Sequence, residues 1–168
     1  MDLVDYYYIP GTVTLSQGNV AKIFKAWGKS YSIIFDIKIT KPGNTWINVF
    51  TITTDEFAGD YETRIPSLAM MGHGKKFRLE HDTKAKYNDG FFFPPGSDYE
   101  LNKVYHVNIS HNDGTDSLRL DGEEIYKNEA GSPPPGIFPE VKLYLSYKRF
   151  PTFADYGIIS DLLILQFR

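Results

Sequence analysis

The segment from Phe77 to Asp82 alternates between two kinds of side chain, and one kind could bind a polar ligand. In an extended strand, Arg78, Glu80 and Asp82 share one face, while the apolar residues share the other face with His81. A guanidinium beside two carboxylates offers a hydrogen-bonding platform for sugar hydroxyls. The same charges could instead form cross-strand ion pairs worth about 0.2–1 kcal/mol each. We take Arg78, Glu80 and His81 as candidate ligand-binding residues.

The loop of residues 55–62 carries four carboxylates in eight residues, a composition that could hold a hard cation. Calcium takes about six to eight oxygen ligands, and this loop could supply two or three of them. The segment Tyr87–Gly90 could add oxygens if the two loops meet. The alternative is a solvated acidic loop at the rim of a sheet, which is favoured because the spacing fits no specific calcium pattern. The candidate calcium ligands are Asp55, Asp60, Glu62, Asn88 and Asp89.

Several aromatic residues could stack on a ligand. Trp46 is in phase with Phe50, so it is either a core residue or a platform for a sugar ring, and we expect the core. The run Phe91–Phe93 precedes two prolines, and three consecutive side chains cannot all point inward from a strand, so at least one is expected to be exposed or tucked beneath the loop. Arg64 either anchors the acidic loop or faces a ligand. The further candidate ligand-binding residues are Trp46, Asn48, Arg64, Tyr87 and Phe92.

The elements that must position these residues are strands. From Tyr31 to Ile39, every second residue is apolar, and residues 104–110 repeat the pattern. Asn112–Gly114 and Asp121–Gly122 have the composition of tight turns. No stretch has sustained helical periodicity, and no repeat or linker divides the chain, so we expect one domain over residues 1–168. Further strands are expected at 12–15, 20–25, 46–53, 65–71, 76–82, 116–120, 123–127, 140–146 and 157–167.

Composition restricts the partners. The 168 residues have a net charge of −3, with 18 basic and 21 acidic residues and no cationic patch, so nucleic acid is not expected. No apolar run approaches membrane-spanning length, so membrane insertion is not expected either. The start, Met1–Asp5, is acidic and does not read as a signal peptide.

The order of motifs in the later part of the chain resembles laminin-G and concanavalin A-like domains. Residues 101–109 followed by 118–124 look like their paired strand and Asp-Gly hairpin, with Tyr105 near a common tryptophan position. Residues 156–162 look like their closing strand. Residues 46–53 and 64–68 are similar to poorly characterised secreted metazoan modules on this scaffold, in which an arginine stands at the position of Arg64. The resemblance covers about residues 12–167 and implies a two-sheet antiparallel jelly-roll sandwich.

Catalytic patterns of this architecture are missing from the sequence. Jelly-roll glucanases carry Glu-x-Asp-x-x-Glu on one strand, but here Glu80 and Asp82 are followed by alanine at position 85. Cysteine is absent, which excludes thiol catalysis. The histidines lack zinc-ligand spacing, and His106 and His111 are expected at the surface. We therefore predict no catalytic residues and a protein that is not an enzyme.

The sequence thus predicts an all-β, concanavalin A-like jelly roll that recognises carbohydrate like a lectin, with calcium as a candidate cofactor. The first alternative is a protein-interaction or matrix-adhesion module without a sugar site, and the second is a glycoside-active enzyme. The expected partner is a glycan or an extracellular protein, an extracellular location follows from the resemblance, and pairing with a second copy stays open.

Overall fold

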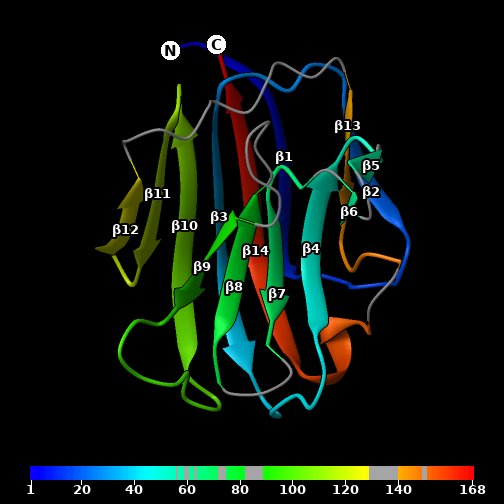
Figure 1. Cartoon of the computed structure of the whole chain (residues 1–168). Coiled ribbons are helices and arrows are strands. Elements are labelled where there is room, and N and C mark those ends of the chain that lie inside the picture. The colour runs from blue at the N-terminus through cyan, green and yellow to red at the C-terminus, as the bar shows by residue number, and fades with distance from the viewer. Residues whose placement is uncertain are drawn as a thin grey trace.

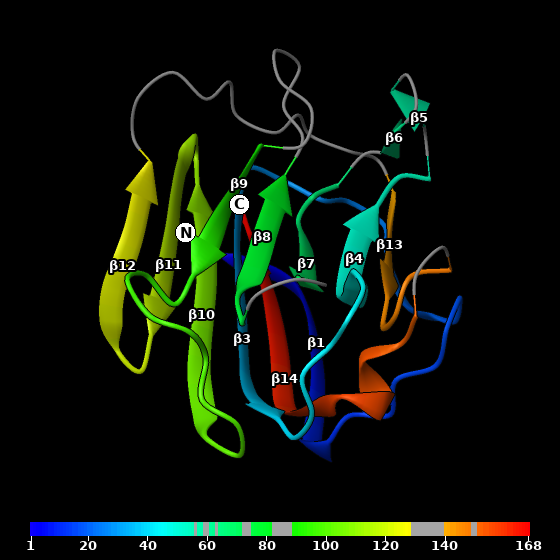
Figure 2. The ribbon, with the colours of Figure 1, turned by 60° about the horizontal axis from the view of Figure 1, so that its bottom comes forward.

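Two antiparallel sheets pack face to face in this chain (Figure 1; Figure 2). The computed structural model describes residues 1–55, 64–71, 75–81, 89–128, 140–148 and 151–168, and the backbone of 57–58 and 61–62. Within these ranges each sheet has six strands, which confirms the predicted two-sheet antiparallel jelly-roll sandwich. No helix in the described ranges has the length and apolar character needed to cross a membrane.

Sheet A contains, in spatial order, β1 (Leu3–Thr12), β14 (Gly157–Phe167), β3 (Ser30–Ile39), β10 (Val104–Asn112), β11 (Thr115–Leu120) and β12 (Glu123–Asn128). Sheet B contains β2 (Val20–Phe24), β13 (Val141–Tyr144), β4 (Ile47–Thr53), β7 (Ser67–Met70), β8 (Phe77–His81) and β9 (Asp89–Phe93). A small separate pair joins β5 (Phe57–Ala58) to β6 (Tyr61–Glu62), and a short 3-10 helix, η1 (Phe153–Asp155), precedes β14.

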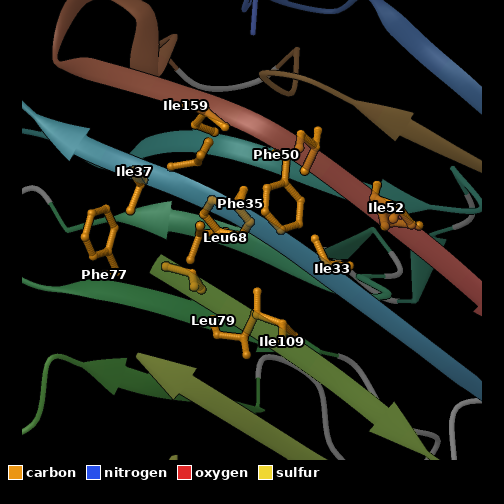
Figure 3. Packing of buried hydrophobic residues seen from close by; sticks show 14 of the residues in the cluster. Ile33, Phe35, Ile37, Phe50, Ile52, Leu68, Phe77, Leu79, Ile109 and Ile159 are labelled. Carbon is orange, nitrogen blue, oxygen red and sulfur yellow. The ribbon is translucent and has the colours of Figure 1, made fainter. Parts of the chain in front are cut away.

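The hydrophobic core lies between the two sheets and follows the predicted alternation. Every second residue of β3 from Tyr31 to Ile39 is buried, as are Tyr105, Val107 and Ile109 of β10. Phe35 of sheet A meets Phe50 of sheet B edge to face, with ring centroids 5.7 Å apart (Figure 3). Because each fully buried side chain of this size contributes roughly 1.5–3 kcal/mol, this alternation fixes which face of each strand points outward.

Two edge strands of the large sheets, β1 and β9, were not expected from the sequence. β1 was not expected, since three consecutive tyrosines at 6–8 hide its alternation, and of residues 12–15 only Thr12 lies in a strand. β9 includes the run Phe91–Phe93 and ends just before Pro94, a residue that cannot donate to a sheet ladder. Among the described strands, β1 has β14 and β9 has β8 as its one neighbour.

Trp46 is 40% exposed, and the expectation that it lies in the core is wrong. The pairing of β4 with β7 shifts register between Asn48 and Phe50, and the consecutive residues Val49 and Phe50 are both buried. Such a bulge inserts one residue, so side chains before it point the opposite way from those predicted by counting back from Phe50. Trp46 is therefore turned out of the core.

An aspartate joins the two sheets at one end of the core. The Nδ1 of His111 lies 2.6 Å from Oδ1 of Asp116, and the Nε2 of His111 accepts a bond from the Gly114 N–H at 3.2 Å. Oδ2 of Asp116 lies 3.3 Å from Nε2 of His81 in sheet B. His111 is 2% exposed, so its predicted surface position is wrong: the alternation of β10 continues through residue 111 and carries this side chain inward.

The surroundings of this aspartate are aromatic as well as polar. Tyr31 stacks on His111 with ring centroids 5.5 Å apart. Burial raises the pKa of Tyr31 well above its usual value, and the charge of Asp116 raises it further. Tyr31 therefore stays a neutral phenol. His81 of sheet B points into the sandwich, where it contacts Asp116 of sheet A.

Candidate ligand-binding face of sheet B

The strand register of sheet B brings together residues that are far apart in the sequence. Ala69, Arg78 and Phe92 are cross-strand partners in one row of β7, β8 and β9, and Ser67, Glu80 and Gly90 form the next row. Directly opposite residues of an antiparallel pair project from the same side of a sheet. The apolar residues between them point to the core, so these two rows face outward, and we call them the β7–β9 outer face.

One carboxylate on this face lies between two guanidinium groups. Oε1 of Glu80 lies 2.8 Å from Nε of Arg78, and Oε2 lies 3.1 Å from Nε of Arg64. The exposed fractions are 17% for the Arg64 side chain, 18% for Arg78 and 12% for Glu80. Charge-assisted bonds of this length fix both partners strongly. Arg64 thus contacts the predicted face instead of standing apart in a loop.

The guanidinium of Arg78 also lies against Phe92, with Cζ 4.7 Å from the ring centroid. Gly90 makes this position possible, because a Cβ there would lie 2.9 Å from the Nε of Arg78 and 2.8 Å from the Leu79 carbonyl oxygen. Phe92 itself is 39% exposed. Glu80, Phe92 and the bare backbone at Gly90 together hold one cationic group in a fixed place beside an exposed aromatic ring.

The three phenylalanines of β9 have three different surroundings. Phe91 stacks on Tyr126 of β12 with centroids 4.4 Å apart, and Phe93 is buried against Phe77 with centroids 5.2 Å apart. Phe92 points the other way. The prediction that at least one of them is exposed or tucked beneath the loop is confirmed, and the exposed ring is the one that contacts Arg78.

The other candidate residues do not add to the exposed part of this face. Asn48 adjoins it, because Asn48 pairs with Ala69 and donates to Oγ of Ser67 at 3.3 Å, but its side chain is buried. Its amide also donates to Oγ1 of Thr51 at 2.9 Å and accepts from the Tyr147 N–H at 2.7 Å, so it holds the chain together. His81 is turned inward toward Asp116, away from Arg78 and Glu80. Trp46 lies just before β4, at an exposed position, and Tyr87 lies outside the described residues.

The candidate calcium ligands are not gathered in the described part of the chain. Asp55 receives bonds from Nζ of Lys142 at 3.0 Å and from the hydroxyl of Tyr144 at 2.8 Å. The bond to Asp55 and the charge of Asp55 raise the pKa of Lys142. Asp89 is in β9, separated from β4 by two strands, or about 14 Å at ordinary strand spacing, so one ion cannot bind both aspartates. No group of three acidic or histidine residues suited to a metal occurs in the described ranges. Asp60, Asn88 and the Glu62 side chain lie outside them.

Half of the residues on this face were brought together by the strand register and could not be assigned to it from the local sequence. Arg78 and Glu80 were predicted to share a face, but nothing in the local sequence placed Arg64, Gly90 and Phe92 beside them. Gly90 in particular resembles an ordinary turn glycine in the sequence, and only its position opposite Glu80 reveals its contact with Arg78.

Comparison with known proteins links this sandwich to proteins of very different sequence. No protein-family model and no curated protein matches the chain. Among solved structures it is similar to Trypanosoma rangeli sialidase, with a TM-score of 0.55 and 15% identity over 83% of this chain and 21% of that one. The likeness is one of fold.

Two botulinum neurotoxin structures are similar in the same way. One is of type C, whose cell entry depends on interaction with two ganglioside molecules; the TM-score is 0.55 at 14% identity, covering 82% of this chain and 32% of that one. The other is the receptor-binding domain of mosaic serotype C/D, with a TM-score of 0.58 at 11% identity, covering 98% and 43%. This chain therefore spans less than half the length of each of these proteins. The sandwich class is supported, while identities this low carry no function across.

Proposed function

We propose that this chain is a non-catalytic, lectin-like carbohydrate-binding module whose glycan lies on the β7–β9 outer face. The observation that carries the proposal is the fixed guanidinium of Arg78 between Glu80 and the exposed ring of Phe92. Guanidinium groups donate to sugar hydroxyls, carboxylates accept from them, and an exposed aromatic ring offers an apolar surface to the face of a pyranose. The ganglioside dependence of a toxin with this fold adds coarse support.

The same face supports binding without turnover. Glycoside hydrolysis requires two carboxyl groups on either side of the scissile bond, in most families about 5–9.5 Å apart. In the described rows of this face Glu80 is the carboxylate present, and it lies 3.1 Å from Nε of Arg64 and 2.8 Å from Nε of Arg78. We further propose that the module is extracellular and belongs to the concanavalin A-like superfamily, as the sequence resemblance implies.

A glycan array tests this function. Wild-type protein is expected to bind a subset of the array, and Phe92→Ala is expected to weaken that binding by about 3- to 10-fold, because an aromatic contact of this kind contributes roughly 0.5–1.5 kcal/mol. Val104→Ala, an exposed apolar residue of sheet A, serves as the matched control and should bind like wild type. An array without hits, or equal binding by the Phe92 variant, would refute the proposal.

We further propose that a calcium ion bound by the acidic loop assists glycan binding. Its ligands are Asp55, Asp60 and Glu62. Lys142 competes with the ion for Asp55, so Lys142→Met is expected to increase the rise in melting temperature that calcium causes. The measurement is a thermal melt of both proteins with calcium and with chelator, where binding to the native state raises the midpoint. If neither midpoint moves, calcium plays no part.

A protein-interaction module is the second candidate function, and the exposed edge strand β1 is the observation that favours it. Tyr6 and Tyr8 are 60% and 50% exposed on one side of β1, and β14 is the one neighbour of β1 among the described strands. A long edge strand with exposed aromatic residues is suited to pairing with another chain, including a second copy. In that case Tyr6→Ser with Tyr8→Ser should abolish an association that sedimentation detects, and leave glycan binding unchanged.

A further inference from the structure

We infer that a pocket at one end of sheet A binds a small neutral molecule with an apolar body and one O–H or N–H group, and that Oε1 of Gln166 accepts its hydrogen bond. The pocket involves β1, β14, the start of β3 and the segment before β3, so it is separate from the β7–β9 outer face. The inference therefore goes beyond the glycan-binding function and does not depend on it.

The pocket lies where residues near the two ends of the chain meet (Figure 1). Main-chain hydrogen bonds of 3.2 and 3.0 Å join Asp2 to Arg168 beside it. Its volume is about 270 Å³, close to the lower end of the range for small-molecule sites. Its lining is mainly apolar and includes Val4 of β1, Phe167 of β14 and Ala26. The pocket thus suits a compact ligand whose surface is largely apolar.

Gln166 of β14 is a buried polar residue of this lining whose hydrogen bonding is incomplete. It is 0% exposed and pairs with Tyr31 of β3, which is also buried. Its Nε2 donates to the Ser30 carbonyl oxygen at 3.0 Å, whereas its Oε1 has no hydrogen-bond partner in the part of the chain that the structure describes. A buried acceptor has already lost its bonds to water, so a ligand that donates to Oε1 gains a bond without further desolvation of the amide.

The neighbours of this amide determine which of its two ends accepts. The end that lies 3.0 Å from the Ser30 carbonyl oxygen must be the NH2 group, because a carbonyl oxygen can only accept. Gly28 lies near the same end, since a Cβ added there would be 3.4 Å from Nε2. The other end is therefore the amide oxygen, which accepts and cannot donate. A ligand must accordingly bring an O–H or N–H group to it.

The apolar lining disfavours two other classes of ligand. A pyranose carries several hydroxyl groups, most of which would lose bonds to water without finding a partner on apolar residues, and a charged group would lose more. Lys29 and Arg168 also line the pocket, but both are exposed, so water solvates their charges, and Nζ of Lys29 lies 3.5 Å from Asp113. A phenol or a small cyclic alcohol combines an apolar body with one donor and meets the requirements of this site.

The test is an NMR titration of isotope-labelled protein with phenol, toluene and benzoate, which have similar apolar bodies and differ in the polar group. Phenol is expected to bind with a Kd of about 1 mM, and about 5-fold or more tightly than toluene or benzoate. The signals that move should include the side-chain amide of Gln166 and the backbone amides of Gly28 and Phe167. If none of the three compounds moves these signals, the pocket holds only water and the inference is overturned. Tighter binding of benzoate than of phenol would overturn the neutral class of ligand.

Variants separate the role of Oε1 from that of the pocket as a whole. Gln166→Leu removes the acceptor at similar size and should abolish the preference for phenol over toluene, a ratio that a change in stability alone does not alter. Ala26→Leu, at an exposed position of the lining, should weaken the binding of phenol and toluene alike. Ala154→Leu, the same change at an exposed position of η1, is the control and should bind like wild type. A phenol preference that persists in the Gln166 variant would contradict the assignment of Oε1, and if that variant does not fold, the wild-type comparison and the Ala26 variant decide.

Discussion

Replacing Asp116 with alanine is expected to lower the free energy of unfolding by about 3 kcal/mol. The carboxylate accepts from His111 at 2.6 Å and contacts His81 of the opposite sheet at 3.3 Å. Without it, the buried Nδ1–H of His111 loses its acceptor, and the contact that joins the two sheets at this end of the core is lost. Urea denaturation of the two proteins measures the difference.

Glu100→Ala is the matched control for this prediction, because it removes a carboxylate of which 72% of the side chain is exposed and whose partner, Lys103, is 3.5 Å away. Exposed pairs of this kind contribute about 0–1 kcal/mol. If the Asp116 variant loses no more stability than the Glu100 variant, the polar contact between the sheets has no structural role.

Gly157→Ala is expected to destabilise the fold by a similar amount, about 3 kcal/mol, through overpacking. A Cβ at this position would overlap the Lys38 carbonyl oxygen and the ring of Phe153. Gly157 pairs with Ile39 at the start of β14, and Phe153 is fully buried in the core, so neither neighbour can withdraw without breaking the ladder or opening a void. Calorimetric or urea unfolding gives the loss.

Gly43→Ala tests whether backbone contact is the cause. A Cβ there would lie 2.7 Å from Cδ1 of Ile47 and 2.8 Å from Cε of Met70, which are the far ends of flexible side chains that can rotate away. We expect a loss of about 1 kcal/mol or less for this variant. Equal losses at both glycines would show that the close approach of backbone at Gly157 is not what forbids a side chain.

The sequence predicted those strands in which alternation runs unbroken. β3 and β10 are flanked by strands on both sides, and each buries every second residue, so their pattern is complete in the sequence. The prediction for Trp46 was wrong because the bulge at Asn48–Phe50 adds a residue that the hydrophobic pattern of the sequence does not reveal. β1 was not predicted because three consecutive tyrosines at 6–8 hide its alternation.

The candidate site was predictable only in part, since half of it depends on pairing between distant segments. The alternation of side chains along an extended strand was enough to predict that Arg78 and Glu80 share one face. The burial of Asn48 depends on Tyr147, a residue 99 positions away, and the position of Phe92 beside Arg78 depends on the register of β8 with β9. Such contacts are set by packing of the whole sandwich, which a local pattern does not contain.

The most direct test of the glycan-binding face is amide hydrogen exchange with and without the strongest-binding glycan from the array. Bound ligand slows exchange where it stabilises or covers the chain. The proposed site predicts added protection in β8 (Phe77–His81) and β9 (Asp89–Phe93), with little change in the outer strands of sheet A. Protection confined to β1 and β14, with none in β8 and β9, would contradict it and place the ligand on the opposite sheet.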